Sequence, residues 1–366
     1  MGVWAGIDIG GANLKAATSH ELAATTFQFW KHPNQLSDQI SQLLLQIEPF
    51  DRLAVTMTGE LADCFESREH GVNFICNAVA KVADAKHPRF YQTTGELVEL
   101  ATAKRAWQQT AASNWHALAA FVAHHVKTCI VVDVGSTTTD LIPILNGKPA
   151  TRGQTDFSRL AHGELLYVGV NRTPVCSICD SVTIGESRVG VANELFATML
   201  DVYIVLGKTS ESADSGHTAD GRESTRAAAK RRLAKMVCCD EMDLSDDQIR
   251  SLAQQIADLH RKKIAHAMQR IGNQHPRAKE WVLAGEGEWI AEEILLSDTS
   301  STRATSDVPG TTAKPGTGIR SLASLFDEHG NSAEISAVGP AFALAMLAEK
   351  ITRPVNLTVS TDESSS

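Results

Sequence analysis

The sequence predicts an α/β protein with two domains. Its 366 residues are more than one domain usually holds, and 43% of them are hydrophobic, which is enough for a sizeable core. An apolar strand at Val3–Ile9 runs into a glycine turn and a returning strand, and Cys129–Val134 opens a second unit of the same kind. Segments with the apolar spacing of helices follow both units. The repeated opening indicates a duplicated architecture.

The first half alternates short strands with helices. Leu36, Ile40, Leu43 and Ile47 recur at helical spacing, and Ser113 or Asn114 is a suitable N-cap for a later helix. The expected strands are 3–9, 14–18, 52–57 and 90–92. A turn at 59–65 enters a helix, and the other expected helices are 35–47, 78–85 (the weaker pattern) and 115–126.

The second half begins with strands at 129–134 and 140–144 and continues mostly with helices. We expect helices at 186–206, where Gly190 interrupts the pattern, and at 224–237, 245–271, 289–296 and 333–350. A short strand at 281–284 ends in Gly285-Glu286-Gly287, just before one of these helices. Residues 297–318 are rich in Ser, Thr, Pro and Gly, which predicts a surface loop or a disordered insertion.

Composition and charge exclude several classes of protein. The net charge of −9 and the aromatic share of 5% argue against a nucleic-acid-binding surface, which needs basic and stacking side chains. No apolar run approaches the roughly 18 residues of a membrane helix. Seven cysteines, an odd number at irregular spacing, favour a reduced, cytoplasmic protein. Cys176-x-x-Cys179 has no second pair to complete a zinc site, so ordinary thiols are expected there.

The first glycine turn, at Asp8–Lys15, has the composition of a phosphate-binding hairpin. Gly10 and Gly11 let backbone amides approach an anion closely, and Asn13 lies beside them. Asp8 at the strand end is suited to a hydrated Mg²⁺, which prefers carboxylate oxygen. Considered alone, a plain β-turn with a buried cap explains the same residues equally well.

The second turn, Asp133–Asp140, repeats this pattern with hydroxyl groups. Asp140 on the returning strand is expected close to Asp133, and two facing carboxylates repel unless a cation or a proton lies between them. Four hydroxyl residues follow Gly135, and those suited to wrap a second phosphoryl group are Ser136, Thr137 and Thr138. The alternative is again a structural hairpin, which threonine favours.

Together, the two hairpins and the later strand, Gly-x-Gly and helix resemble the phosphate-1, phosphate-2 and adenosine motifs of the actin–hexokinase–Hsp70 ATPase superfold. In that fold, two ribonuclease-H-like domains close around a phosphate-bearing ligand in a central cleft. The resemblance implies an N-terminal domain at 1–127 and a C-terminal domain at 128–355, with the insertion at 297–318 and a polar tail at 356–366. It also implies that the two hairpins face each other across the cleft.

More specific motifs resemble the hydantoinase A/oxoprolinase family. Thr56–Asp63 and Asp133–Pro143 are similar to stretches typical of the whole family. A smaller branch is formed by proteins linked to tetrahydromethanopterin-dependent one-carbon transfer. This branch shares further matches, in the right order over most of residues 1–295, at 114–115, 155–165, 169–176, 196–203 and 218–222.

The resemblance to this branch implies a transferase of methanofuran biosynthesis. Such an enzyme condenses an aminomethylfuran diphosphate with γ-glutamyltyramine or a related phenol and releases pyrophosphate. The implied cofactor is Mg²⁺, with ATP compatible but not required. The implied partners are small phosphorylated molecules, and a homo-oligomer is left open. The main alternative is an ATP-dependent kinase or a hydantoinase- or oxoprolinase-like hydrolase of the same fold. A third is a non-catalytic protein that kept the cleft.

The implied site residues fall into three groups. Asp8 and Asp133 are expected to bind Mg²⁺, directly or through water, while the residues of the two turns bind the diphosphate. Asp140 is the leading candidate for the base that takes the phenol proton, and Glu164 is the second; Asp8 also lies at this catalytic centre. Substrate or nucleotide contacts are expected from Thr58, Glu60, Arg172, Asp220, Arg222, Gly285 and Gly287.

Structural explanations stand beside some of these roles. A salt bridge explains Arg172 equally well, and a contact that stabilises their own loop explains Asp220 and Arg222. Glu60 is also explained by the first turn of a helix, where acids are favoured.

Overall fold

The computed structural model describes residues 2–213, 218–301, 318–326 and 332–352, and two mixed sheets form its framework. The first sheet has the order β3-β2-β1-β4-β5-β6. Its strands are β1 (Trp4–Ile9), β2 (Asn13–Ala17), β3 (Leu22–Thr26), β4 (Arg52–Met57), β5 (Arg89–Tyr91) and β6 (Leu97–Val98). β1 pairs antiparallel with β2 and parallel with β4, in the register Asp8 to Lys15 and Asp8 to Thr56.

The second sheet repeats this plan. Its order is β10-β8-β7-β13-β14, and β9 also pairs with β8. Its strands are β7 (Cys129–Val134), β8 (Thr139–Leu145), β9 (Lys148–Pro149), β10 (Leu165–Leu166), β13 (Glu280–Ala284) and β14 (Gly318–Ser321). β7 pairs antiparallel with β8, in the register Asp133 to Asp140, and parallel with β13. The predicted α/β class with two duplicated units is confirmed.

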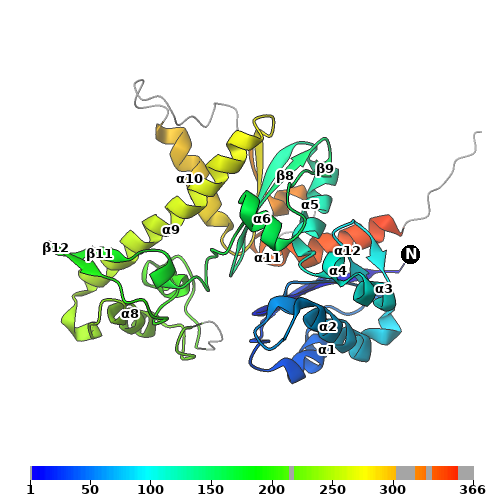
Figure 1. Cartoon of the computed structure of the whole chain (residues 1–366), viewed down its shortest axis with the longest axis horizontal. Coiled ribbons are helices and arrows are strands. Elements are labelled where there is room, and N and C mark those ends of the chain that lie inside the picture. The colour runs from blue at the N-terminus through cyan, green and yellow to red at the C-terminus, as the bar shows by residue number, and fades with distance from the viewer. Residues whose placement is uncertain (1, 214–217, 302–317, 327–331, 353–366) are drawn as a thin grey trace, which may run out of the picture.

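Helices cover both faces of each sheet (Figure 1). The first half has α1 (Leu36–Leu45), α2 (Arg68–Ala83), α3 (Leu100–Arg105), α4 (Trp107–Thr110) and α5 (Asn114–His125). The second half has α6 (Asp156–His162), α7 (Met199–Val205), α8 (Arg226–Lys235), α9 (Asp246–Gln274), α10 (Glu288–Ser301), α11 (Ser332–Ala337) and α12 (Gly339–Ile351). Within the described ranges, no helix combines the length and the apolar character needed to cross a membrane.

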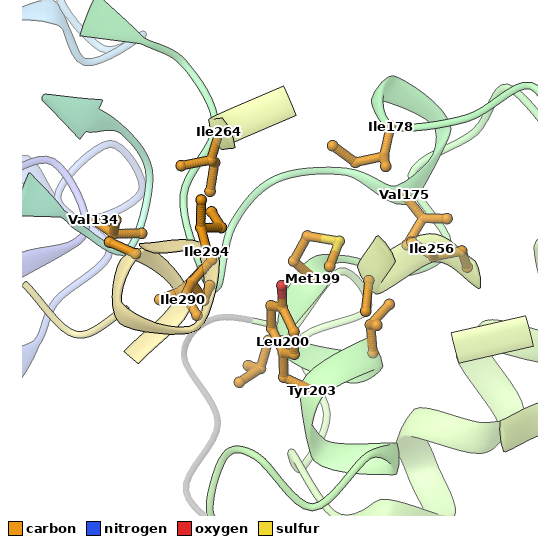
Figure 2. Close-up of a cluster of buried hydrophobic side chains, with 14 of the residues drawn as sticks. Val134, Val175, Ile178, Met199, Leu200, Tyr203, Ile256, Ile264, Ile290 and Ile294 are labelled. Carbon is orange, nitrogen blue, oxygen red and sulfur yellow. The ribbon is translucent and has the colours of Figure 1, made fainter. Parts of the chain in front are cut away.

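The alternation of side chains along β1 and β7 places both aspartates toward the layer between the sheets. Ile7 and Ile9 of β1 point into a core with α1 and α2, so Trp4, Gly6 and Asp8 point to the opposite side. The same holds for β7, where Val131 joins the central core while its neighbours pack toward α7, α9 and α10. Figure 2 shows part of that outer core, with Met199 from α7. The central core is built on α5 and α12.

The last helix packs against the first strand. A Cβ atom placed on Gly6 of β1 would lie 2.0 Å from the carbonyl oxygen of Ala341 in α12, so only glycine permits this approach. Trp4 also reaches the end of the helix, where its indole nitrogen donates to Thr352 Oγ1 at 3.1 Å. α12 therefore covers the first sheet, although it follows the second sheet in sequence. The domain boundary at residues 127 and 128 stays a prediction.

Three predicted elements differ from the structure. The helix expected at 186–206 is confirmed only at its end, as α7 (Met199–Val205), and is wrong at its start, because 181–190 form the hairpin of β11 (Ser181–Ile184) and β12 (Ser187–Gly190), with Gly185 at φ +59° in the turn. The weak helix at 78–85 is the end of α2, which begins much earlier, where Ser67 accepts from the His70 amide. The last helix is divided into α11 and α12 at Gly339-Pro340.

The predicted insertion and tail fall mostly on residues that are not described. Residues 297–301 of the insertion belong to α10, residue 318 begins β14, and residues 302–317 lie outside the described ranges. The tail at 356–366 also lies outside them.

Candidate active site

Both glycine hairpins line one cavity between the two sheets. The cavity has a volume of about 560 Å³. From the first sheet and its connections it is lined by Asp8, Gly10, Gly11, Ala12, Asn13, Lys15, Trp30, Thr58, Leu61, Ala62, Asp63 and Asn114. From the second half it is lined by Asp133, Gly135, Ser136, Thr137, Thr138, Asp140, Asp156, Arg159, Leu165, Tyr167, Arg172, Leu195, Ala337 and Pro340.

The two hairpins have equivalent backbone geometry. The Gly10 amide donates to the Asn13 carbonyl at 3.0 Å, and the Gly135 amide donates to the Thr138 carbonyl at 2.8 Å. Between these closing bonds, the backbone amides of each turn's tip donate to no described residue; they belong to Gly11, Ala12, Ser136 and Thr137. The Ser136 hydroxyl is buried, also without a partner among the described residues. Such unsatisfied donors are suited to bind the oxygens of an anion.

Each hairpin is held from behind by a supporting segment. The amides of Phe27 and Phe29 donate to the Ala12 and Gly11 carbonyls at 2.9 and 3.1 Å. In the second hairpin, the amides of Asn171 and Arg172 donate to the Ser136 carbonyl at 3.1 and 2.9 Å. Because their carbonyls are occupied in this way, the turns are fixed with their tips toward the cavity.

The second supporting segment is anchored by a buried histidine. A Cβ on Gly169 would lie 2.5 Å from the Thr137 backbone, so this glycine packs directly on the hairpin. The Gly169 carbonyl can only accept, so His260 Nε2 donates to it at 3.2 Å, and Nδ1 accepts from the Tyr203 hydroxyl at 2.8 Å. Burial lowers the pKa of His260 to about 4, which keeps the imidazole neutral.

The two leading aspartates are buried carboxylates with raised pKa values. Burial raises the pKa of Asp8 to about 6, although Lys15 and a 3.4 Å hydrogen bond from Asn114 oppose the shift. Asp8 Oδ1 has no partner among the described residues. Burial, together with the charge of Asp140, raises the pKa of Asp133 to about 7. Because both carboxylates lack sufficient counter-charge, a bound cation would stabilise their ionised form.

The oxygen donors present fit Mg²⁺ better than a metal held entirely by the protein. In the described part of the chain, no group of three or more His, Cys, Asp or Glu side chains is arranged as a metal site. Cys176 and Cys179 therefore belong to no such group among these residues. Mg²⁺ commonly takes one or two protein carboxylates and completes its shell with water and phosphate oxygens. Asp8, with its unpartnered Oδ1, and Asp133 would supply that pair.

Asp140 lies in the cavity and is fixed by an arginine that sequence reasoning missed. Arg159 donates to Asp140 Oδ1 at 2.6 Å from a fully buried position, and its guanidinium lies 4.2 Å from the centre of the Trp115 ring. Glu164 does not line the cavity. Its carboxylate is fully buried and accepts from the Arg152 and Gly153 amides at 2.6 and 2.9 Å. This geometry speaks against Glu164 as the base and supports a role in holding its loop.

An ion pair that sequence reasoning did not predict joins the two sheets beside the hairpins. Lys15 on β2 lies 3.2 Å from Glu286 in the Gly-x-Gly segment, and the Asn171 side-chain amide donates to the other Glu286 oxygen at 2.7 Å. Burial alone would lower the pKa of Lys15, but Glu286, Asp8 and Asp133 raise it above its ordinary value. The lysine thus places positive charge next to the two aspartates.

Arg172 and Thr58 lie at the cavity as predicted, but other predicted contacts do not. Glu60 is buried beside Arg68 at 3.5 Å, and burial raises its pKa to about 7. Gly285 has φ +90° and lies close to the end of β7, where a Cβ added to it would be 2.3 Å from the Val134 carbonyl oxygen. The Gly287 amide donates to the same carbonyl at 2.8 Å. These glycines therefore serve close packing.

The pair Asp220 and Arg222 also lies outside the cavity. Asp220 accepts from the Arg222 amide and from Arg232 Nη1, both at 3.1 Å, and the Thr218 hydroxyl donates to the Arg222 carbonyl at 2.6 Å. Arg232 is buried and also pairs with Asp201 at 2.7 Å. The geometry supports the loop-stabilising explanation for both residues.

Comparison with known proteins adds a family to this geometry. Residues 51–319 match the family model described as hydantoinase/oxoprolinase. The chain is 31% identical over 296 residues to a Methanocaldococcus jannaschii protein named as the synthase of (4-(4-(2-(γ-L-glutamylamino)ethyl)phenoxymethyl)furan-2-yl)methanamine, which covers 79% of this chain and 88% of the relative. A Methanococcus vannielii protein of the same name is 34% identical over 184 residues, 50% of this chain and 82% of the relative.

Among solved structures, nucleotide-free acetone carboxylase aligns with a TM-score of 0.48 at 9% identity, over 79% of this chain and 66% of that one. The archaeal actin homolog Ta0583 in complex with ADP aligns with a TM-score of 0.42 at 12% identity, over 95% of this chain and 99% of that one.

Proposed function

The chain belongs to the hydantoinase/oxoprolinase family, and we propose that it is the transferase that joins an aminomethylfuran diphosphate to the phenol of γ-glutamyltyramine, with release of pyrophosphate. The proposal rests on the activity for which two relatives are named and on a cavity of matching chemistry. The product in those names contains a phenoxymethylfuran, which is the ether that such a condensation forms.

One observation of this structure carries the proposal. Two turns from different sheets, each with unsatisfied backbone amides, line the same cavity beside two buried carboxylates. Amides at both turns are suited to bind the two phosphoryl groups of one diphosphate. Lys15 adds a cation next to the aspartates. This arrangement is suited to bind a diphosphate that departs as the leaving group, and equally the phosphates of a nucleotide that remains bound.

The chain's own groups would bind and orient the diphosphate. The amides of Gly11 and Ala12 would donate to one phosphoryl group, and the amides and hydroxyl of Ser136 and Thr137 to the other. Asp8 and Asp133 would hold Mg²⁺, which when bound neutralises the charge that develops on the leaving diphosphate. Lys15 is placed to keep that charge compensated on the side of the first sheet.

The condensation forms one bond and breaks one. The phenol oxygen forms a bond to the methylene carbon on the furan, while the bond from that carbon to the diphosphate oxygen breaks. The electron pair of the broken bond leaves with pyrophosphate, and the furan ring stabilises positive character at the methylene carbon. The phenol proton goes to a carboxylate of the enzyme, so atoms and charge balance.

We place that proton on Asp140, because Asp133 would hold Mg²⁺ and a carboxylate bound to a metal does not accept a proton at the same time. Asp140 is directly paired with Asp133 across β7 and β8 and lines the cavity, so it lies beside the proposed diphosphate site. Arg159 fixes the Asp140 carboxylate from behind at 2.6 Å. Arg159 is a positioning residue, since it acts through Asp140.

The test is a reconstituted reaction. Purified protein is incubated with the furan diphosphate, γ-glutamyltyramine and Mg²⁺, and the coupled ether and pyrophosphate are measured by mass spectrometry and a phosphate assay. We expect both products in equal amounts without ATP, and loss of both with a chelator. No ether under these conditions would contradict the proposal. Product formation that needs ATP, or ATP hydrolysis stimulated by substrate, would favour the ATP-dependent alternative.

A further inference from the structure

A guanidinium that forms no ion pair with any described residue lines the cavity, next to a tryptophan. The supporting segment of the first hairpin continues into Trp30, and that of the second hairpin ends at Arg172. Arg172 Cζ lies 4.4 Å from the centre of the Trp30 ring, so the two segments meet across the cavity. In the described part of the chain, no carboxylate lies within ion-pair distance of Arg172, and its side chain donates no hydrogen bond.

Stacking on an indole leaves the arginine free to bind a planar anion. A cation–π contact with the ring does not occupy the N–H groups of the guanidinium with a hydrogen-bond acceptor. Those donors match the two oxygens of a carboxylate in a bidentate arrangement. Partial burial lowers the pKa of Arg172, although Tyr167 and Asp63 oppose the shift, and the guanidinium remains charged at any physiological pH.

The surroundings of this arginine differ from those of the hairpin tips. The charges acting on Arg172 come from Tyr167 and Asp63, both of which line the cavity. Three large side chains that line the cavity are about half exposed: Leu61, Tyr167 and Leu195. Such exposure is unusual for side chains of this size and suits contact with an apolar ligand.

We propose that Arg172, stacked on Trp30, binds the carboxylate of the amino-acid end of an aromatic acceptor, with Asp63 toward the ammonium group and Leu61, Tyr167 and Leu195 against the aromatic part. This subsite rests on the proposed function, because γ-glutamyltyramine is an aromatic amine conjugate that ends in an amino acid. Arg172 is then a specificity-determining residue for the acceptor. The hairpin tips and the two aspartates remain the diphosphate site.

The neighbouring acid distinguishes this role from diphosphate binding. A diphosphate carries several negative charges, and Asp63 would repel it. An amino-acid end carries one carboxylate and one ammonium group, so an arginine and an aspartate complement it together. The aspartates of the hairpins act on each other and on Lys15, whereas none of them is among the charges that shift Arg172.

The experiment compares two acceptors that differ only at that end. Wild-type protein and the variants Arg172→Ala, Asp63→Asn and Arg188→Ala are assayed with γ-glutamyltyramine and with tyramine, each with the furan diphosphate and Mg²⁺. Arg188 is the matched control, because it is an exposed arginine on β12 that, among the described residues, bonds only Ser181. Circular dichroism and thermal unfolding confirm that each variant is folded.

We expect wild type and Arg188→Ala to use γ-glutamyltyramine roughly 10- to 100-fold better in kcat/KM than tyramine, which is the value of one charge-assisted hydrogen-bonded pair. Arg172→Ala should remove most of this preference through a raised KM for γ-glutamyltyramine, while the rate with tyramine and the KM for the furan diphosphate stay the same. Asp63→Asn should reduce the preference by a smaller factor. A preference that survives in Arg172→Ala, or a raised KM for the furan diphosphate, would overturn the subsite.

Calorimetric titration separates the subsite from the proposed function. Both amines are titrated into wild type and Arg172→Ala without the diphosphate, so no chemistry is needed. If no ether forms but γ-glutamyltyramine binds in a way that depends on Arg172, the subsite stands and the proposed reaction is wrong. If the wild type neither forms the ether nor binds γ-glutamyltyramine, both are wrong.

Discussion

Replacing His260 with glutamine should change how the stability of the protein depends on pH. His260 is fully buried between the Tyr203 hydroxyl and the Gly169 carbonyl, and burial lowers its pKa from 6.5 to about 4. In the unfolded chain the histidine returns to its ordinary pKa. The unfolded state therefore binds one more proton than the folded state between about pH 4 and 6.5, and the free energy of unfolding falls as the pH is lowered through that interval.

The size of the effect follows from the two pKa values. A separation of 2.5 pKa units, each worth about 1.4 kcal/mol, gives roughly 3 kcal/mol of stability lost between pH 7 and pH 4. Glutamine does not titrate, and its amide retains a donor for the Gly169 carbonyl. The stability of wild type minus that of His260→Gln should therefore be roughly 3 kcal/mol smaller at pH 4 than at pH 7.

The assay is urea unfolding, followed by tryptophan fluorescence, at several pH values from 4 to 7.5. Tyr203→Phe is the control, because it removes the hydroxyl that bonds Nδ1 but keeps the buried imidazole, so it should lower stability by about 1 kcal/mol and keep the wild-type slope. Parallel stability profiles for wild type and His260→Gln would refute the reasoning, since they would mean that the histidine already titrates normally in the folded protein.

Three further predictions concern packing and the site. Gly6→Ala should lower the free energy of unfolding by roughly 3 kcal/mol, because its methyl group would collide with a carbonyl of α12. Gly190→Ala, with open space around the residue, should change the free energy of unfolding by less than about 0.5 kcal/mol. Equal urea midpoints for the two variants would contradict this. Asp133→Asn should reduce the rate of condensation by roughly 100-fold or more. In the presence of chelator at pH 8 it should also raise the unfolding midpoint, because the raised pKa of Asp133 means that its ionised carboxylate destabilises the folded state at that pH. A variant that is active, or less stable than wild type, would argue against this account. Lys15→Met, Glu286→Gln and the double variant should give a coupling energy of roughly 1 kcal/mol in unfolding experiments, and strictly additive effects would mean that the ion pair between the sheets contributes no stability.

The sequence alone predicted those parts of the site whose motif lies within a short stretch of the chain. An apolar strand that ends in Asp-x-Gly, as at Asp8 and Asp133, is visible within about ten residues, and both predicted hairpins form and line one cavity. Thr58 and Arg172 were found through motifs and also lie at the cavity. The chemical roles assigned to these residues remain predictions.

What the sequence could not supply depends on contacts between distant residues. Nothing near Lys15 indicates that its partner is Glu286, and nothing near Asp140 indicates that Arg159 would fold back on it. Glu164 was mistaken for a candidate base because its own loop, which it stabilises through two backbone amides, is not apparent from spacing.

Weak periodicity accounts for the wrong secondary structure. The stretch 186–206 contains apolar residues at intervals that fit a helix, but Gly185 and Gly190 bound a short strand instead. Trp30 was missed as a site residue because a tryptophan after an irregular segment carries no motif. Its position became evident only through its contact with Arg172.

The docking of α12 on β1 has a consequence for how the protein folds while it is being synthesised. The ribosome releases β1 long before α12, which follows all strands of the second sheet in the chain. Until that helix emerges, the surface around Trp4 and Gly6 remains uncovered, and the N-terminal half cannot finish its own interior. The N-terminal half of the nascent chain therefore completes its interior only after α12 has emerged, so its folding lags behind its own synthesis.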